Sequence, residues 1–139
     1  MAKLTEQDFY FGVGLAALFK YNPYIMPSLI ENVTDTKLKG KKIKITKGIF
    51  YKLHTLQNGE AIIYIKYTDR KITNKENIGL WKFSLSDIEK NKIDVQRKNV
   101  IPFYMVLICV DTNDISNSEV AVLTEAEYLE INDRSSIEI

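Results

Sequence analysis

Residues 100–110 read VIPFYMVLICV, a continuous apolar run that gives way to a polar segment at Asp111. The run is shorter than the roughly 20 residues of a transmembrane helix, and it is rich in β-branched side chains. It therefore predicts a strand buried on both faces, with Pro102 tolerated because it stands near the start. Such a strand needs cover on both sides, so we expect helices on both faces of a sheet.

The helices are marked by capping-box patterns, in which Ser or Thr stands three residues before an acidic side chain. The three pairs are Thr5 with Asp8, Ser86 with Glu89, and Thr124 with Glu127. They predict helices from residue 6 to 20, from 86 to about 91 and from 124 to about 131. For the middle helix, Ser84 is an alternative cap that fits the pattern less well.

Alternation of apolar and polar side chains predicts the remaining strands. They cover residues 41–46, 49–56, 60–67 and 119–123, with a further short strand over 80–83 that buries Trp81 or Phe83. Lys47-Gly48 is predicted to be a turn, and Asn58-Gly59 a type I′ hairpin turn.

The other segments carry weaker signals. Residues 22–36 are predicted to be a connection with one or two helical turns within 26–33, and residues 68–79 a polar loop. We expect the last eight residues to fray.

Together these elements predict one α+β domain over residues 1–139, with a core from about 5 to 131. The expected order is α-β-β-β-α-β-β-α around a mixed sheet. A length of 139 residues and a hydrophobic share of 45% fit one packed soluble domain. One Cys excludes a disulfide framework within the chain. Because no basic-then-apolar leader and no spanning run is present, we expect a cytoplasmic protein without membrane contact.

The net charge of +1 hides an uneven distribution. Residues 1–36 sum to −2, residues 37–98 to +10 because 16 Lys and Arg oppose six acidic side chains, and residues 99–139 to −7. We expect the central cations to converge on one positive surface that suits a polyanion, beside an acidic end. The alternative interpretation is that the strands and a helix carry separate, solvated lysines.

Two other features invite a chemical interpretation that their context disfavours. GVGLAA at residues 12–17 matches G-x-G-x-x-A, the dinucleotide fingerprint, but a helix begins before it where the fingerprint needs a strand. Its small residues are expected to let the helix pack closely. Cys109 falls inside the apolar run and is predicted to be an inert core thiol.

A second group of side chains has the chemistry of a metal-dependent nuclease. In such sites carboxylates on adjacent strands hold Mg²⁺, and a nearby Lys polarises the water or the phosphate. Glu60, Lys66 and Asp69 are the candidates here. Mg²⁺ is the cofactor of this hypothesis, and no cofactor is expected otherwise.

The order helix, three strands, helix, strand resembles the core of the restriction-endonuclease-like, or PD-(D/E)XK, fold. The stretches IYIKY at residues 63–67 and LWKFS at 80–84 are similar to those of short bacterial proteins that combine a YIKY strand with a W-x-F segment. The resemblance implies that Lys66 takes the place of the motif lysine. Since Tyr64 stands where the motif has an acid, it implies an incomplete site, or one rebuilt with Glu6 or Asp69.

Three functions remain open at this point. The first is a non-catalytic nucleic-acid-binding module that uses residues 41–52 and 66–82, with Trp81 or Tyr67 stacking on bases. Its phosphate contacts are expected from Lys42, Lys44, Lys66, Arg70, Lys71 and Lys82. The second is the Mg²⁺-dependent nuclease. The third is a protein-interaction module, such as an inhibitor or immunity-type partner, that uses the acidic residues 111–138 or the basic face.

Overall fold

The computed structural model describes residues 3–22, 24–38, 42–56, 59–73, 75–76, 79–134 and 136–139, with side chains for all of these except 21, 35–38 and 42–46. Within these ranges the elements are α1 Glu6–Tyr21, β1 Met26–Leu38, β2 Lys42–Thr55, β3 Gly59–Thr68, β4 Lys71–Thr73, β5 Gly79–Ser84, α2 Asp87–Arg97, β6 Phe103–Cys109, the 3₁₀ turn η1 Ile115–Asn117, β7 Glu119–Thr124, α3 Glu125–Ile131 and β8 Ser136–Glu138.

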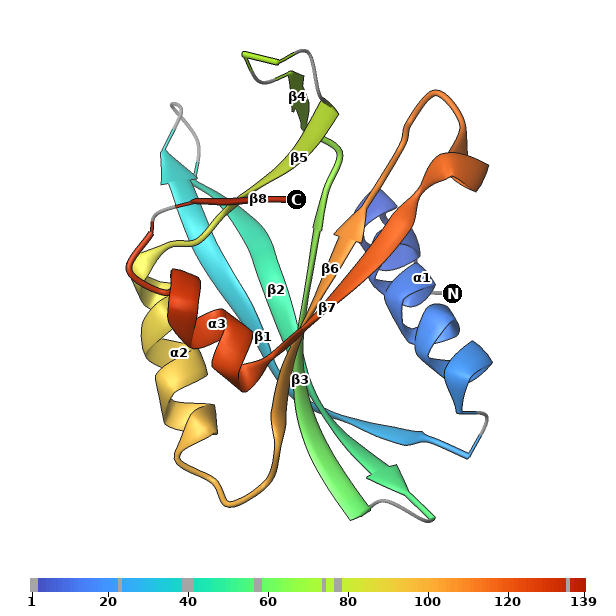
Figure 1. Ribbon diagram of the computed structural model, residues 1–139, viewed down its shortest axis with the longest axis vertical. Coiled ribbons are helices and arrows are strands. Elements are labelled where there is room, and N and C mark those ends of the chain that lie inside the picture. The colour runs from blue at the N-terminus through green and yellow to red at the C-terminus, as the bar shows by residue number, and fades with distance from the viewer. Residues whose placement is uncertain are drawn as a thin grey trace.

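The main sheet has five strands in the order β1-β2-β3-β6-β7. All neighbours are antiparallel except β3 and β6, which are parallel. A parallel pair needs a crossover, and here the crossover consists of β4, β5 and α2. A small second sheet, in the order β4-β5-β8, lies at one end of the main sheet (Figure 1).

Different helices cover the two faces of the main sheet (Figure 1). On one face α1 contributes Phe11 to an apolar cluster with Ile63 and Ile65 of β3. On the opposite face, Ile93 of α2 and Tyr128 of α3 belong to a second cluster, which includes both central strands. The predicted α+β class, the mixed sheet and the helices on both faces are therefore confirmed.

The buried centre of the sheet is formed by β3 and β6. Their register places Ile62 opposite Phe103 and Thr68 opposite Cys109. All of β6 is buried except Tyr104, which is partly exposed, and the strand begins directly after Pro102. The doubly buried strand predicted from residues 100–110 is confirmed. Cys109 is the last residue of β6, and its side chain is buried as expected.

All three predicted capping boxes form. In α2 the Glu89 N–H donates to Ser86 Oγ at 3.3 Å, and Ser86 N–H donates to Glu89 Oε2 at 2.8 Å. The same reciprocal bonds begin α1 and α3. The second helix extends to Arg97, beyond the expected end near residue 91, because buried Ile93 anchors its second half to the core.

Close packing of α1 depends on Gly14. A Cβ at this position would lie 2.7 Å from Cδ1 of Ile108, so any larger residue would require the Ile108 side chain or the helix to shift. Gly12 faces open space instead. The expectation that small residues let this helix pack closely is thus confirmed at Gly14 and wrong at Gly12.

Residues 26–38 form the edge strand β1, so the predicted connection with helical turns is wrong. Two bulges, between Leu29 and Glu31 and between Val33 and Thr34, break the register with β2. Among the described side chains of β1, only Val33 is buried. A bulged strand with one buried residue has no alternation of apolar and polar side chains, which explains why the sequence pattern missed it.

The predicted turn at Lys47-Gly48 is also wrong, because β2 continues through these residues, with a bulge in which Lys47 is left without a partner on β1. Gly48 is needed for space: a Cβ there would overlap the phenol ring of Tyr64 on the neighbouring strand. The hairpin between β2 and β3 is confirmed, and Gly59 has a φ of +75°. The predicted type I′ turn at Asn58-Gly59 is wrong, because a two-residue turn would set residue 57 opposite Glu60, whereas the register sets His54 opposite Glu60 and Thr55 opposite Gly59. Asn58, the other residue of the predicted turn, lies outside the described residues.

The end of the chain is ordered by β5. The predicted strand at 80–83 forms and buries both Trp81 and Phe83, while the loop expected before it contains the short strand β4. The predicted fraying of the last eight residues is wrong, because β8 pairs with β5 and Ile137 is only 5% exposed. The apolar side chain of Ile137 joins the cluster of Trp81 and Phe83, which offsets the entropy of ordering the chain end.

Candidate functional site

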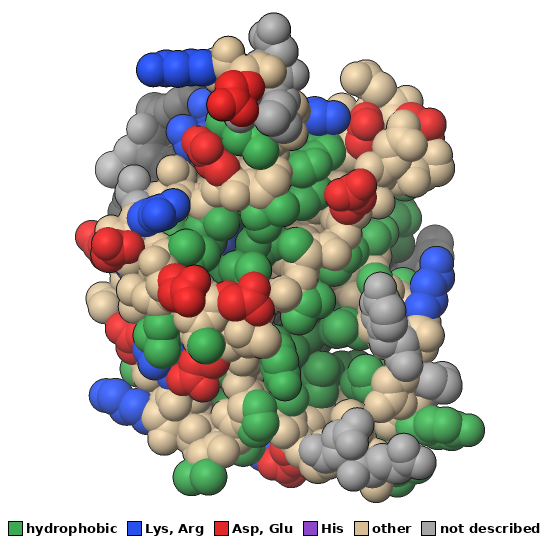
Figure 2. Space-filling model, in the orientation of Figure 1, with side chains coloured by type: hydrophobic (Ala, Val, Ile, Leu, Met, Phe, Trp, Pro, Cys, Tyr) green, Lys and Arg blue, Asp and Glu red, His purple; other side chains and the backbone are tan. Residues whose placement is uncertain are grey.

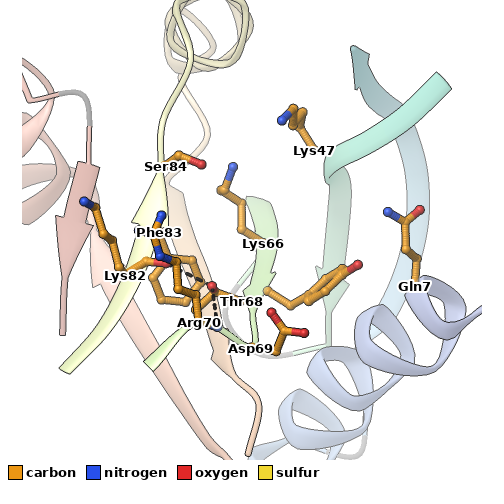
Figure 3. A pocket seen from close by; sticks show the side chains of 10 residues that line it. Gln7, Lys47, Lys66, Thr68, Asp69, Arg70, Lys82, Phe83 and Ser84 are labelled. Atoms are coloured by element: carbon orange, nitrogen blue, oxygen red, sulfur yellow. Dashed lines mark hydrogen bonds between the residues drawn. The ribbon is translucent and has the colours of Figure 1, made fainter. Parts of the chain in front are cut away.

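The described residues form a pocket of about 340 Å³ where β3 ends, between α1, β2 and β5. Four cationic side chains line it, and each comes from a different segment: Lys47 from β2, Lys66 from β3, Arg70 from the β3–β4 connection, and Lys82 from β5. The remaining lining residues are Gln7, Tyr67, Thr68, Asp69, Phe83 and Ser84. We call this site the cationic pocket (Figure 3).

Lys66 forms the buried floor of the cationic pocket. Its side chain is 6% exposed and pairs with Oε1 of Glu89, which is 1% exposed. Burial lowers the pKa of Lys66 and nearby Lys47 lowers it further, although the Glu89 carboxylate acts in the opposite direction. The Lys66 side chain is therefore fixed in place by its pairing with the Glu89 carboxylate.

Glu89 is fully engaged by donors from two elements. Its Oε1 also accepts a hydrogen bond from the Tyr64 hydroxyl at 2.7 Å, and its Oε2 accepts from the N–H and hydroxyl of Ser86 at 2.8 and 3.0 Å. Burial and this carboxylate raise the pKa of Tyr64, so its hydroxyl remains a neutral donor. The carboxylate thereby connects the start of α2 to β3, directly behind the cationic pocket.

The other three cations of the cationic pocket have no carboxylate partner within the described part of the chain. None of Lys47, Arg70 and Lys82 takes part in an ion pair there, and neither does the single lining carboxylate, Asp69. Lys47 and Lys66 rise from neighbouring strands on one side of the cavity, whereas the Lys82 side chain points away from Lys66 at the rim (Figure 3). Positive charge therefore exceeds negative charge around this cavity.

Hydrogen bonds at Thr68 fix the wall that carries Arg70. The Thr68 hydroxyl donates to the Lys82 carbonyl at 2.9 Å and accepts from the Arg70 N–H at 3.1 Å. The Lys82 N–H in turn donates to the Arg70 carbonyl at 3.0 Å. The backbone of Arg70 is thus fixed against β5 by protein contacts alone, while the Arg70 side chain is exposed.

The wall on the side of α1 is aromatic. Tyr67 is hydrogen-bonded to the Gln7 side chain, and its ring packs against Tyr10 at 4.8 Å and Phe11 at 5.2 Å between ring centroids. Burial raises the pKa of Tyr67. Tyr67 therefore presents a neutral, fixed ring beside the cations.

The structure brings together some of the residues that the sequence singled out and separates others. Lys66, Asp69, Arg70 and Lys82 line the cationic pocket. Lys71 and Trp81 line a different one with Asp111 and Glu119; the Lys71 ammonium lies 5.3 Å from the Trp81 ring, which is only 8% exposed. Lys42 and Lys44 lie at the start of β2, and their side chains are outside the described part.

Glu60 lies far from the other two residues of the nuclease hypothesis. It begins β3, where it pairs with Lys52 and His54, both at 3.1 Å. Lys66 stands six residues further along the same strand, about 20 Å away at the usual rise per residue. Among the described residues no group of three His, Cys, Asp or Glu side chains is arranged to hold a metal ion.

Two residues of this site were not expected from the sequence. Lys47 was placed in a turn, and its approach to Lys66 depends on the register that sets Ile49 opposite Ile65. Glu89 was predicted only as a helix cap, and its pairing with Lys66 is a tertiary contact across 23 positions. The capping box located Glu89 correctly, but it carries no information about a partner on a strand.

The negative charge of the last third of the chain gathers elsewhere. On the face drawn in Figure 2, acidic side chains lie over α3 and near the loop that holds η1, and basic side chains lie mainly at the margin. Each of the pockets that contain Lys71, Lys92 or Arg134 has only that one cation in its lining. The cationic pocket is thus set apart from this acidic face.

No family model, no curated protein and no solved structure matches this chain. The helices of the described part lack the combination of length and hydrophobicity that a bilayer crossing requires.

Proposed function

We propose that this chain is a nucleic-acid-binding module without catalytic activity, and that its phosphate contacts centre on the cationic pocket. The observation that carries the proposal is that Lys47, Arg70 and, at the rim, Lys82 line one cavity, with no protein carboxylate paired to them in the described part. Cationic side chains without protein partners are available to an anionic ligand, and phosphate oxygens accept hydrogen bonds from ammonium and guanidinium groups.

One further feature supports a nucleic acid over a small anion alone. Tyr67 lines the cavity beside the cations, and an aromatic ring in that position offers a nucleobase a surface.

The proposal is tested by fluorescence anisotropy with labelled single-stranded and double-stranded DNA and RNA. Because phosphate contacts release counterions, we expect micromolar or tighter binding at low salt and a loss of tenfold or more between 50 and 200 mM salt. No detectable binding of any of these nucleic acids at low salt would overturn the proposal. A stoichiometric protein that copurifies and resists nuclease treatment would instead favour the protein-interaction hypothesis.

Matched variants locate the binding surface. Lys47→Gln and Arg70→Gln are each expected to weaken binding severalfold and to reduce the salt dependence by about one ion. Lys98→Gln is the control, because Lys98 is equally cationic and exposed but follows the far end of α2. Equal losses in all three variants would assign binding to net charge and not to the pocket.

Asp69 separates binding from the nuclease hypothesis. If the pocket only binds phosphate, Asp69→Asn removes a repulsive charge and should tighten binding about twofold to tenfold. If Asp69 holds a catalytic Mg²⁺, the same variant should abolish cleavage instead. We expect nucleic acid incubated with the wild-type protein and Mg²⁺ or Mn²⁺ to remain intact, and cleavage that disappears in Lys66→Ala would contradict this.

A further inference from the structure

Several cations of the described residues 37–98 gather around one cavity without an ionic partner. Four other cations of this segment are engaged by protein groups: Lys52 with Glu60, Lys71 with the Trp81 ring, Lys92 with Glu31, and Arg97 with Glu125 and Asp94. Lys75, Lys90 and Lys98 have no ion pair among the described residues, but none of them lines the cationic pocket. A protein that follows the backbone of a nucleic-acid strand needs cations spaced along a groove, whereas here the lining cations share a single cavity.

The net charge around the cationic pocket matches two negative charges on the ligand. Lys66 is balanced by Glu89. Lys47, Arg70 and Lys82 face one lining carboxylate, Asp69, so an excess of about two positive charges is left, of which the charge of Lys82 lies at the rim and points away from Lys66 (Figure 3). A phosphodiester inside a strand carries one negative charge, whereas a terminal phosphate carries about −1.5 to −2 at neutral pH. A terminal phosphate therefore complements this cavity better than an internal phosphate does.

The volume of the cationic pocket, like its charge, suits a single terminal nucleotide. At about 340 Å³ it lies at the small end of ligand pockets, which span roughly 300 to 1,000 Å³. A cavity of this size accepts one nucleotide-sized group and excludes a duplex. Its fixed parts suit such a group, because Lys66 is held by Glu89 at the floor and the backbone of Arg70 is held by Thr68 at the wall.

We infer that the cationic pocket binds a phosphomonoester at the end of a nucleic-acid strand. This inference rests on the proposed function and goes beyond it, because it names the part of the nucleic acid that is recognised. The terminal phosphate lies among Lys47, Lys66 and Arg70, and the base next to it meets the ring of Tyr67. The exposed guanidinium of Arg70 supplies the planar pair of donors that phosphate oxygens prefer.

The test is a competition experiment with an internally labelled, 5′-phosphorylated single-stranded DNA as the probe. Unlabelled DNA of the same sequence is added as competitor with a 5′-phosphate, with a 3′-phosphate or with hydroxyls at both ends. We expect at least one phosphorylated form to displace the probe at about one tenth of the concentration that the hydroxyl form requires, a difference of about 1.4 kcal/mol. Equal displacement by all three forms would overturn the inference and leave the proposed function standing.

Free ligands distinguish the strand end from a general anion site. A nucleoside monophosphate and inorganic phosphate are added as competitors to the same probe. We expect both to compete more weakly than the phosphorylated strand, since they lack the contacts of the following nucleotides. If inorganic phosphate competes as well as the phosphorylated DNA, the inference fails. If the probe does not bind at all, the inference fails, and the proposed function fails with it only if the other DNA and RNA probes also show no binding at low salt.

Variants assign the preference to the cationic pocket. Arg70→Gln is expected to bring the affinities for phosphorylated and hydroxyl strands within about twofold of each other, and Arg70→Lys to restore part of the difference. Lys98→Gln is expected to keep the full tenfold ratio. A ratio that is unchanged in Arg70→Gln would place recognition of the terminal phosphate outside this pocket and overturn the inference.

Discussion

Two buried tyrosine hydroxyls are in opposite situations. The Tyr64 and Tyr128 side chains are both fully buried, but only the Tyr64 hydroxyl has an acceptor, the Glu89 carboxylate. The Tyr128 hydroxyl has no hydrogen-bond partner in the described part of the chain, and burial raises the pKa of Tyr128 to about 12. Removal of the two hydroxyls should therefore change stability in different directions.

Replacement of each tyrosine by phenylalanine tests this difference. We expect Tyr64→Phe to lower the free energy of unfolding by about 1.5–3 kcal/mol, because a charged acceptor loses a donor. Tyr128→Phe should leave it unchanged or raise it by about 1 kcal/mol, because an unpaired polar group is removed. Urea denaturation followed by Trp81 fluorescence measures both, and equal losses in the two variants would contradict the argument.

Two glycines form a second matched pair. Gly48→Ala places a Cβ against the Tyr64 ring, and overpacking of this kind lowers the free energy of unfolding by about 1–3 kcal/mol. Gly12→Ala adds a methyl group in open space within a helix and should raise it by about 0.5–1 kcal/mol. Thermal unfolding of the two variants checks the signs, and a stabilising Gly48→Ala would show that the ring is free to move aside.

At the scale of the elements, sequence patterns located those helices and strands whose own residues determine their structure. Three capping boxes located the three helix starts, and the apolar run at 100–110 located β6. The strands that were missed, β1, β4 and β8, lie at sheet edges and depend on partners. The bulged strand β1 pairs with β2, and both β4 and β8 pair with β5, so none of the three carries a pattern of its own.

The strand at the chain end provides an element-scale prediction. Ile137→Ala should lower the free energy of unfolding by about 2–4 kcal/mol, because it opens a cavity beside Trp81 and Phe83. Leu56→Ala is the control, since Leu56 is 80% exposed and its loss should change stability by less than about 0.5 kcal/mol. Chemical denaturation compares the two, and equal small effects would mean that β8 contributes nothing to the core.

The candidate site was predictable where neighbours in sequence are neighbours in space. Lys66, Asp69 and Arg70 share the end of one strand and so share a pocket. Lys71 directly follows Arg70 but packs over Trp81, in another pocket, and Glu60 shares the strand but not its end. The contributions of Lys47 and Glu89 required the strand register and the placement of α2, which no local pattern contains.

At the scale of the whole molecule, the cations were expected to form one coherent surface. The described side chains divide them instead: three without ionic partners line the cationic pocket, several others are held by carboxylates or by an aromatic ring, and Lys75, Lys90 and Lys98 lie unpaired outside the pocket. Only part of the charge excess of the central segment therefore belongs to one site. This is why the proposals concern the pocket and not the overall charge of the chain.

Cys109 provides a measure of the integrity of the whole fold. Its side chain is 1% exposed, and burial raises the pKa of its thiol to about 11. Alkylation by iodoacetamide at mildly alkaline pH should therefore be at least a hundredfold slower in the native protein than in urea. Mass spectrometry measures the rate, and rapid stoichiometric labelling without denaturant would contradict the packing of β6.

The parallel pairing at the centre of the sheet sets an order in time for refolding. β2 and β3 are joined by a short hairpin, whereas Ile62 pairs with Phe103, 41 positions later. Closure of the longer loop costs more chain entropy than closure of the hairpin, and this entropy is lost before the stabilising contacts form. We therefore expect the antiparallel strands to assemble early. The cationic pocket should form late, when Glu89 of α2 pairs with Lys66 and β6 pairs with β3.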